Sequence, residues 1–254
     1  MEKSKKKISL ICGLHYIKLF YRTLLFILAL IAYIVGKKQD SGELFLGYEK
    51  NAWIVTSIWA VCVVEMAFRF FPSKLESMGC QKQHKKNYKP TGEDTPTLPS
   101  WKRTLTMFLV YFAINGTLGV LYFTKIIDVG VLVLSSLLYG ACDVVCVLFF
   151  CPFQLWIMKN KCCRDCRIYN WDFFMIFTPL AFIPSFYTWS LLTVSLILLL
   201  LWEIALKMHP ERFSEKTNAC ISCVNCQEKL CHHKKKCTSL LTKLTPPIFK
   251  KHRN

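Results

Sequence analysis

Long apolar runs alternate with lysine-rich segments along the 254-residue chain. A helix needs about 20 mostly apolar residues to cross the roughly 30 Å hydrocarbon core of a bilayer. Four runs meet this length within a few residues, and the alternation expected of barrel strands is absent. The four predicted spans are Leu19–Val35, Ala52–Phe71, Leu105–Phe123 and Val129–Phe150. The pattern therefore predicts an all-α, polytopic membrane protein.

The last apolar block, Phe173–Leu206, is too long for one span and just long enough for two short ones. Pro179 and Pro184 each lack a backbone N–H, so both interrupt helical hydrogen bonding in its first half. The segment IPSFYTW is typical of a tight turn with aromatic side chains at the membrane surface. We therefore predict a helical hairpin with arms of about 17 residues, which gives about six transmembrane helices. A single tilted or kinked span followed by a surface helix is the alternative.

Basic residues predict the orientation, because Lys and Arg accumulate in the cytoplasmic loops of membrane proteins. The net charge of +17 lies almost entirely between the apolar runs. The N-terminus, the loops after the second and fourth spans, and the tail are rich in lysine. The remaining segments carry few basic residues, namely Lys37, Lys38, Lys50 and Lys125. Six spans with both termini cytoplasmic satisfy this distribution, in a multi-pass protein of the cell membrane; a single final span would place the tail outside.

The distribution of charge suits contact with anionic lipid headgroups and does not favour nucleic acid as a partner. Lys18 and Arg22 interrupt the first apolar run, so we do not expect a cleaved signal peptide. The predicted organisation is, in chain order, a basic cytoplasmic N-terminus (1–18), the first two transmembrane helices (19–71), a flexible cytoplasmic loop (72–103), two further transmembrane helices (104–158), a cysteine-bearing cytoplasmic loop (159–171), the transmembrane hairpin (172–207) and a small cytoplasmic tail rich in Cys, His and Lys (208–254).

The predicted topology places most of the 14 cysteines on the cytoplasmic side, with the others in spans and none in an external loop. The cytoplasm keeps thiols reduced, so a disulfide framework is the less favoured use of these residues. Closely spaced, reduced thiolates act as metal ligands or redox groups. The cysteines therefore predict a metal or redox site at the cytoplasmic face.

Two cysteine clusters carry this prediction. One holds Cys163-x2-Cys166 with Cys162 beside it, and the other holds Cys220-x2-Cys223-x2-Cys226-x4-Cys231. A gap of two residues lets both sulfurs of a C-x2-C turn reach one ion. The predicted final hairpin returns the chain to the same face, which would bring the clusters together. The predicted ligand core is Cys163, Cys166, Cys223 and Cys226, with Cys162, Cys220 and Cys231 as alternatives.

The spacing leaves two cofactors open, an iron–sulfur cluster or zinc, and absence of any metal is the third alternative. Zinc suits two C-x2-C pairs, or three cysteines with His232 or His233. The run of three cysteines at gaps of two is similar to the bacterial ferredoxin pattern C-x2-C-x2-C-x3-C-P. This chain departs from that pattern, because Cys231 follows after four residues and His232 stands where proline is expected.

Five residues within the spans are candidate functional groups: Asp143, Glu65, Cys142, Cys146 and Cys62. Ionisable side chains are costly in hydrocarbon and usually face the interior of the bundle. Glu65 is predicted to pair with Arg69, four residues later on the same helix. Asp143 needs a partner from another helix. The candidates for that partner are Asn115, Thr117 and Arg69.

The cysteines within the spans admit two interpretations. Together with Cys151 they could form a path for electrons or a soft metal ion towards the cytoplasmic clusters. Buried thiols also commonly serve only as small apolar packing groups. The sequence leaves both open.

Three functional classes fit the sequence, and no nucleotide-binding glycine loop, hydrolase nucleophile elbow or zinc-protease helix is present. The predicted function is electron transfer or redox chemistry at a cytoplasmic metal site, with a cytoplasmic redox or docking protein as a possible partner. The first alternative is a structural or partner-docking membrane protein with a zinc-stapled tail. The second is a soft-metal carrier, although the spans lack the glycine-broken helices typical of carriers.

Overall fold

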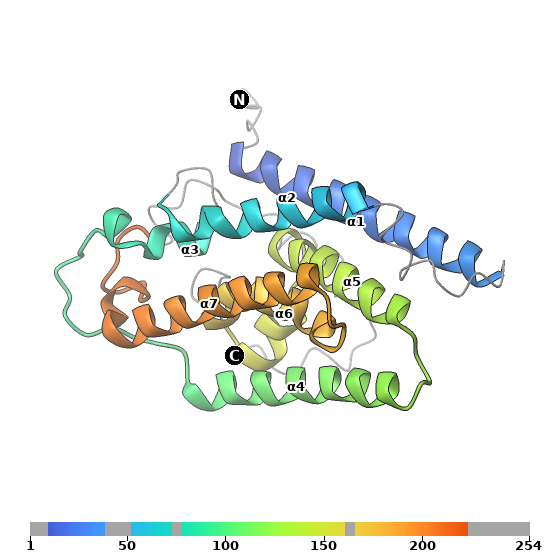
Figure 1. Ribbon diagram of the computed structural model, residues 1–254. Coiled ribbons are helices and arrows are strands. Elements are labelled where there is room, and N and C mark those ends of the chain that lie inside the picture. Colours follow the sequence, from blue (N-terminus) through green and yellow to red (C-terminus); the bar gives the residue numbers. More distant parts are fainter. Residues whose placement is uncertain (1–9, 39–51, 73–77, 161–165, 223–254) are drawn as a thin grey trace, which may run out of the picture.

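The computed structural model describes residues 10–38, 52–72, 78–160 and 166–222 (Figure 1). The all-helical prediction is confirmed for these residues, which form helices and connecting loops without a strand. Five helices are long and apolar enough to cross a membrane. Their bounds are α1 Leu10–Lys38, α2 Ala52–Phe70, α4 Trp101–Phe123, α5 Val129–Leu148 and α7 Phe186–Met208. The chain is therefore a multi-span α-helical membrane protein.

Three of these helices, α2, α4 and α5, match predicted spans closely, whereas α1 differs most from its predicted span. It begins at Leu10 instead of Leu19 and contains Lys18 and Arg22, the two charges that interrupt the apolar run. Both charges have acidic partners on a neighbouring helix. A charge can remain in a helix within the bundle when such partners compensate it. The helix therefore continues through a stretch that hydropathy alone would exclude.

The first arm of the predicted hairpin is an irregular helical segment. It consists of the 3-10 helix η5 (Arg167–Trp171), the α-helix α6 (Asp172–Phe177) and the 3-10 helix η6 (Thr178–Phe182). This segment, which we call the broken segment, is too short to count among the spanning helices, so a count of six is not confirmed. Pro179 explains the irregularity, because it cannot donate to the carbonyl of Met175 and its ring disfavours regular α-helix.

The broken segment nevertheless runs along the length of the bundle. At its start, the Arg167 guanidinium lies 5.3 Å from the ring of Trp101, the first residue of α4. At its end, the ring of Phe182 lies 5.8 Å from that of Phe123, the last residue of α4. Its two 3-10 helices of 5 residues and α-helix of 6 residues extend about 29 Å, because 3-10 turns rise further per residue. The broken segment therefore carries the chain from the end of the bundle where α5 finishes to the end where α7 begins.

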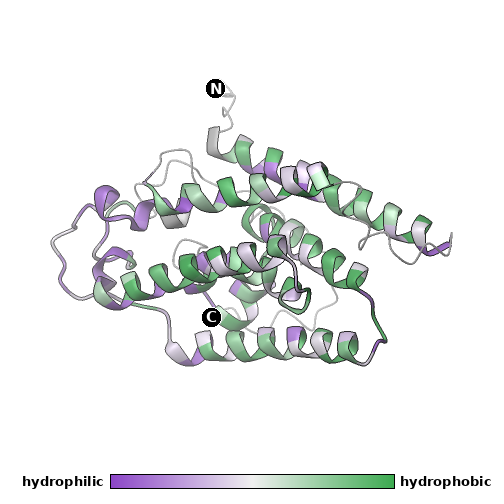
Figure 2. Cartoon of the chain, in the orientation of Figure 1, coloured by the Kyte–Doolittle hydropathy of each residue, from purple (hydrophilic) through white to green (hydrophobic). Residues whose placement is uncertain are grey.

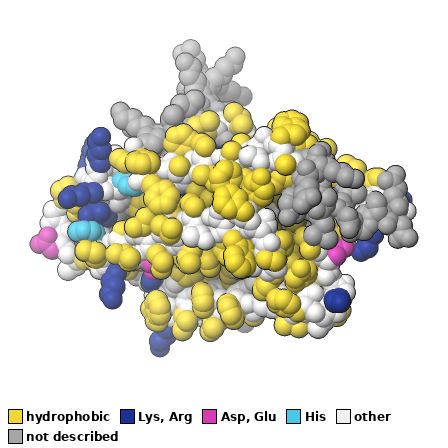
Figure 3. Space-filling model, viewed as in Figure 1, with side chains coloured by type: hydrophobic (Ala, Val, Ile, Leu, Met, Phe, Trp, Pro, Cys, Tyr) yellow, Lys and Arg dark blue, Asp and Glu magenta, His cyan; other side chains and the backbone are white. Residues whose placement is uncertain are grey.

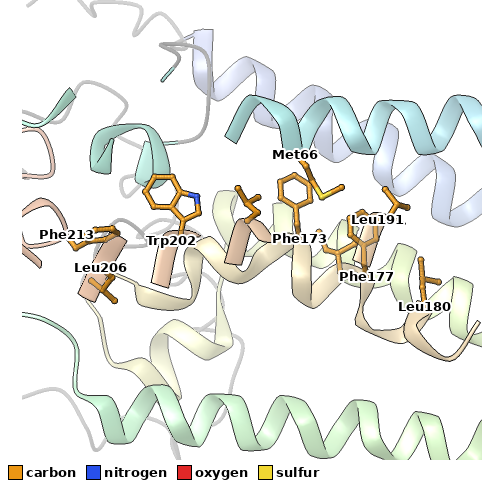
Figure 4. Close-up of a cluster of buried hydrophobic side chains, with 10 residues drawn as sticks. Met66, Phe173, Phe177, Leu180, Leu191, Trp202, Leu206 and Phe213 are labelled. Carbon is orange, nitrogen blue, oxygen red and sulfur yellow. The ribbon is translucent and has the colours of Figure 1, made fainter. Parts of the chain in front are cut away.

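The main buried core lies between α2, the broken segment and α7 (Figure 4). Phe173 and Phe177 stack with their ring planes 17° apart and face Met66 of α2, which is fully buried. Large apolar side chains also cover the outside of the bundle, and the polar residues gather at its ends (Figures 2 and 3). Apolar side chains facing outwards along five helices are what a bilayer requires.

The described part of the chain starts and finishes at one end of the bundle. Beyond the end of α2, the short helix α3 (Met78–Gln83) and the 3-10 helix η2 (Lys85–Asn87) lie against residues that follow α7, including the 3-10 helix η7 (Pro210–Arg212). We call residues 78–99 and 209–222 the cap. Asn218 is fully buried there and donates from Nδ2 to the carbonyls of Lys82, at 3.0 Å, and Arg212, at 2.8 Å. Hydrogen bonds therefore join the loop predicted at 72–103 to the start of the tail.

Candidate functional site

A guanidinium on α1 joins three helices within the bundle. Arg22 Nη2 lies 2.8 Å from Glu65 Oε2 on α2, and Arg22 Nη1 lies 3.1 Å from Asp143 Oδ2 on α5. Arg22 Nη1 also donates to the carbonyl of Gly140, at 3.0 Å. The Arg22 and Glu65 side chains are only 12% and 13% exposed, and that of Asp143 is 26% exposed. The two terminal nitrogens of one partly buried guanidinium thus bridge two carboxylates on different helices.

Glu65 has two further partners on α1. The hydroxyl of Tyr21 donates to Glu65 Oε1, and Lys18 Nζ lies 3.7 Å from the same oxygen. Each Glu65 oxygen is thus bound by α1. Because the partners of Glu65 among the described residues all come from α1, these polar contacts are a principal attachment between α1 and α2.

The predicted pair between Glu65 and Arg69 is wrong. Glu65 binds α1, whereas Arg69 forms a buried ion pair with Asp172, the first residue of α6. The guanidinium of Arg69 also lies over the rings of Tyr169, at 5.8 Å, and Phe173, at 5.0 Å. Glu65, which is partly buried, and Arg69, which is buried, are therefore each neutralised by a different neighbour of α2. Pairing between helices here replaces the pairing along one helix that spacing suggested.

The predicted partners of Asp143 are also wrong, because Arg22 is the residue that binds it. Asn115 instead donates within α4, from Nδ2 to the carbonyl of Tyr111 at 3.0 Å, and Thr117 donates to the carbonyl of Ala113 at 2.9 Å. Arg22 was visible in the sequence only as an interruption of an apolar run. The signal that would have identified Arg22 is a positively charged residue in one span together with an unpaired acid in each of two others.

The cysteines within the spans differ in their surroundings. Cys62 is partly buried against the main core, one turn before Glu65. Cys142 is exposed on the surface of α5, and Cys146 interacts with Cys151 just beyond the end of that helix. These positions put Cys142 at the lipid-facing side of the bundle. A path through these thiols remains a prediction.

Two of the predicted metal ligands are described, one from each cluster. Cys166 is buried at the start of η5, packed with Met107, Met158 and Ile168. Cys220 lies in the cap, where its Sγ donates to the carbonyl of Asn87, at 3.0 Å. The other predicted ligands lie outside the described residues: Cys162, Cys163, Cys223, Cys226 and Cys231.

The segments that lead into both clusters meet at the same short helix, α3. Asn170 of η5, four residues after Cys166, donates from Nδ2 to Gln83 Oε1, at 2.9 Å. Asn218, two residues before Cys220, donates to the carbonyl of Lys82. A cavity of about 20 Å³ beside Cys166 is lined by both η5 and Phe213 of the cap. The fold therefore brings the two cluster-bearing parts of the chain to one end of the bundle.

Among the residues that the structure describes, no group of three or more His, Cys, Asp or Glu side chains is arranged to hold a metal. The described cysteines also form no disulfide. A ligating sulfur must be a thiolate, so Cys220 would lose its hydrogen bond to the Asn87 carbonyl if it bound a metal.

His84 is a titratable residue of the cap that sequence reasoning missed. Its ring packs edge-to-face on Trp202 of α7, with ring centroids 5.0 Å apart. Burial lowers the pKa of the imidazole below its ordinary value, and the nearby Arg212 charge lowers it as well. Nε2 is buried without a hydrogen-bond partner among the described residues. A histidine in a polar loop carries no periodic signal, so only the fold reveals this contact.

Comparison with known protein families, curated proteins and solved structures finds no match to this chain. The functional conclusion therefore depends on the residues and their geometry.

Proposed function

We propose that this chain is an integral membrane protein with a cysteine-ligated metal site at its cytoplasmic end, and that the site serves electron transfer or redox chemistry. One observation carries the proposal: the chain segments next to Cys166 and Cys220 both bind α3, at residues Gln83 and Lys82. Two distant cysteine clusters are thereby led to one end of the bundle. The same end carries most of the described Lys and Arg residues, which favours a cytoplasmic location.

Cys163, Cys166, Cys223 and Cys226 would hold the metal, with Cys162, Cys220 and Cys231 as alternative ligands. An iron–sulfur cluster bound there would supply one-electron transfer. The described residues would contribute rigidity, because Cys166 is buried and precedes the helical start of the broken segment. A second shell of hydrogen bonds orients ligands in such sites. Asn170 and Gln83, both buried beside Cys166, are suited to that role.

A structural or partner-docking protein with a zinc-stapled tail is the second candidate. The observation that favours it is the neutralisation of the intramembrane charges, since Arg22 binds Glu65 and Asp143 in one closed network. Acids held in ion pairs stabilise a bundle without taking part in the transfer of electrons or ions. A soft-metal carrier gains no such support, because hydroxyl groups of Tyr111 and Ser136 already occupy two carbonyls of the broken segment.

Metal analysis and visible absorption of the anaerobically purified full chain would separate these candidates. A visible band that bleaches on reduction, together with bound iron, supports the redox proposal. Zinc without a visible band supports the docking protein. The double variant Cys163→Ser, Cys223→Ser should lose the metal, because each lost thiolate weakens the site. Cys237→Ser, in the same tail but outside the predicted ligands, is the matched control, and unchanged metal in the double variant would refute the assignment.

A further inference from the structure

A candidate binding surface outside the cysteine clusters lies at one corner of the lysine-rich end of the bundle. There the first turn of α4 meets the π-helix η3 (Phe153–Met158), which follows α5. We call this surface the basic corner. Its members share exposure to the outside of the bundle and are either cationic or aromatic: Trp101, Lys102, Arg103, Trp156 and Lys159.

Specific contacts build the basic corner. Arg103 donates from Nη1 to the carbonyl of Met158, at 3.1 Å, which fixes the start of α4 against the end of η3. Beneath this bond, Met107 and Met158 pack in one buried cluster, at 1% and 0% exposure. The relative position of the two chain segments is therefore set by a core as well as by a surface contact.

The positive charge of the basic corner is not compensated within the described structure. Arg103 donates to a neutral carbonyl, and Lys102 and Lys159 have no acidic partner among the described residues. Glu203 is the acid that approaches this region, and it is bound by Arg167 and by the indole N–H of Trp171. Among the residues that the structure describes, these three cations therefore face outwards without a counter-charge.

The backbone at Lys159 adds a second observation. This residue caps η3 in the left-handed conformation, with φ of 52°, and its N–H donates to the carbonyl of Gln154. Glycine or asparagine adopts this conformation at lower cost than lysine. A lysine at this cap therefore places a cation beside Arg103 at a conformational cost.

The aromatic residues identify the kind of partner. Trp156 and Trp101 are 61% and 62% exposed, and Leu155 beside Trp156 is 43% exposed. Indole rings favour the boundary between hydrocarbon and headgroups, where an apolar body and a polar N–H are both satisfied. Cations next to such rings lie at the depth of lipid phosphates. A water-soluble anion would make no favourable contact with the exposed apolar surface.

We propose that the basic corner binds the headgroup of an anionic phospholipid of the adjoining leaflet. The indole rings of Trp101 and Trp156 would lie at the acyl–headgroup boundary, and Lys102, Arg103 and Lys159 would bind the phosphate. This proposal rests on the proposed membrane insertion of the bundle but is independent of the metal site. The net positive charge of the chain indicates an affinity for anionic lipid without locating it, and this proposal locates it at three residues.

The test measures binding of an anionic phospholipid to the full chain in nanodiscs of zwitterionic lipid, where recovery of folded protein confirms insertion separately. Lys159→Asn removes a charge and retains a residue suited to the left-handed backbone. We expect affinity for the anionic lipid to fall about fivefold for each charge removed, in Lys159→Asn and in Lys159→Asn with Lys102→Gln. Raised salt should weaken binding to the unchanged protein as well.

Lys125→Asn is the matched control. Lys125 is also an exposed lysine with positive φ, of 59°, but it follows α4 at the opposite end of the bundle. This variant should bind the lipid normally. Equal losses in the Lys125 and Lys159 variants would overturn the proposal, because binding would then follow net charge alone. Inorganic phosphate that displaces the lipid at matched concentration would also overturn it and would assign the site to a soluble anion.

Discussion

The hydroxyl of Tyr111 on α4 donates a 2.5 Å hydrogen bond to the carbonyl oxygen of Met175. In a regular α-helix this oxygen would accept from the backbone N–H of residue 179, which is a proline and has no N–H. Ser136 of α5 donates to the next carbonyl, that of Ile176, at 2.8 Å. Polar side chains from two spanning helices thus bind carbonyls close to where the broken segment changes from α-helix to 3-10 helix. In a bilayer, irregular backbone is tolerated only where protein satisfies its polar groups.

Tyr111→Phe should destabilise the protein by about 1–3 kcal/mol, because a buried carbonyl loses its added donor. The shape of the side chain is retained, so packing is not expected to change. Unfolding in mixed micelles, followed by circular dichroism, would measure the difference. Tyr122→Phe on the same helix is the control, since the Tyr122 hydroxyl forms no hydrogen bond with the part of the chain that the structure describes. Equal stability of the two variants would show that the Tyr111 bond contributes nothing.

Arg22→Gln should cost more, about 3–5 kcal/mol, because it leaves two partly buried carboxylates without their main cation. Adding Glu65→Gln to this variant should restore part of the loss, since one uncompensated charge is then removed. Lys37→Gln is the control, because its ion pair with Asp128 is exposed and contributes little. The comparison uses the same unfolding assay, and additive losses in the double variant would argue against direct coupling.

Asp143→Asn should leave expression and melting nearly normal, because asparagine keeps the hydrogen bond to Arg22 and Glu65 remains as counter-charge. Glu65→Gln should destabilise more, since Glu65 also binds Tyr21 and Lys18. In a redox protein or a carrier, Asp143→Asn should impair inward transfer without unfolding the bundle. A variant that loses stability yet keeps its metal and redox behaviour would favour the docking protein.

Stability of the cap should decrease as the pH falls below about 6.5, the ordinary pKa of histidine. The pKa of His84 is lowered in the fold, so below this value the unfolded chain binds a proton that the folded chain resists. The loss of stability should grow until the pH reaches the lower pKa that His84 has in the folded protein. Melting curves between about pH 7.5 and about pH 5.5 would measure it. His84→Gln should flatten this dependence, whereas His209→Gln, at a side chain 43% exposed, should retain it.

Reporter fusions at Asn218 and near Gln39 should give opposite signals. The cap that contains Asn218 lies at the lysine-rich end of the bundle, which we expect in the cytoplasm. Gln39 follows the far end of α1. A cytoplasmic signal from both positions would contradict the orientation, and an external signal from Asn218 would remove the case for a cytoplasmic metal site.

Hydropathy predicted the spanning helices well because the signal for each is spread over about 20 residues. The bounds of α2 and α5 agree with the predicted spans within two residues at each end. The failures came from residues whose role depends on a neighbouring helix. Arg22, Tyr111 and Ser136 each act on a partner that lies tens of residues away, and no local pattern identifies such a pair.

The metal site shows a different limit of sequence reasoning. Spacing within each C-x2-C unit is local and readable, whereas the meeting of two clusters depends on how the broken segment crosses the bundle. Pro179 and Pro184 indicated an interruption but not its 3-10 form. The convergence at α3 is therefore a finding of the fold, and the joining of the sulfurs remains a prediction.

The broken segment also constrains the order in which the protein can be made. Its polar groups depend on Arg69, Gln83, Tyr111 and Ser136, and all four precede it in the chain. A ribosome therefore delivers α2, α4 and α5 before the segment that needs them. On its own, this segment would carry Asp172 into lipid without its cation, and the carbonyls of Met175 and Ile176 without the hydroxyls that bind them, and unsatisfied polar groups are costly in lipid. Its entry into the membrane must then be a late step that uses an already assembled scaffold, and mutations in α4 or α5 can arrest biogenesis there.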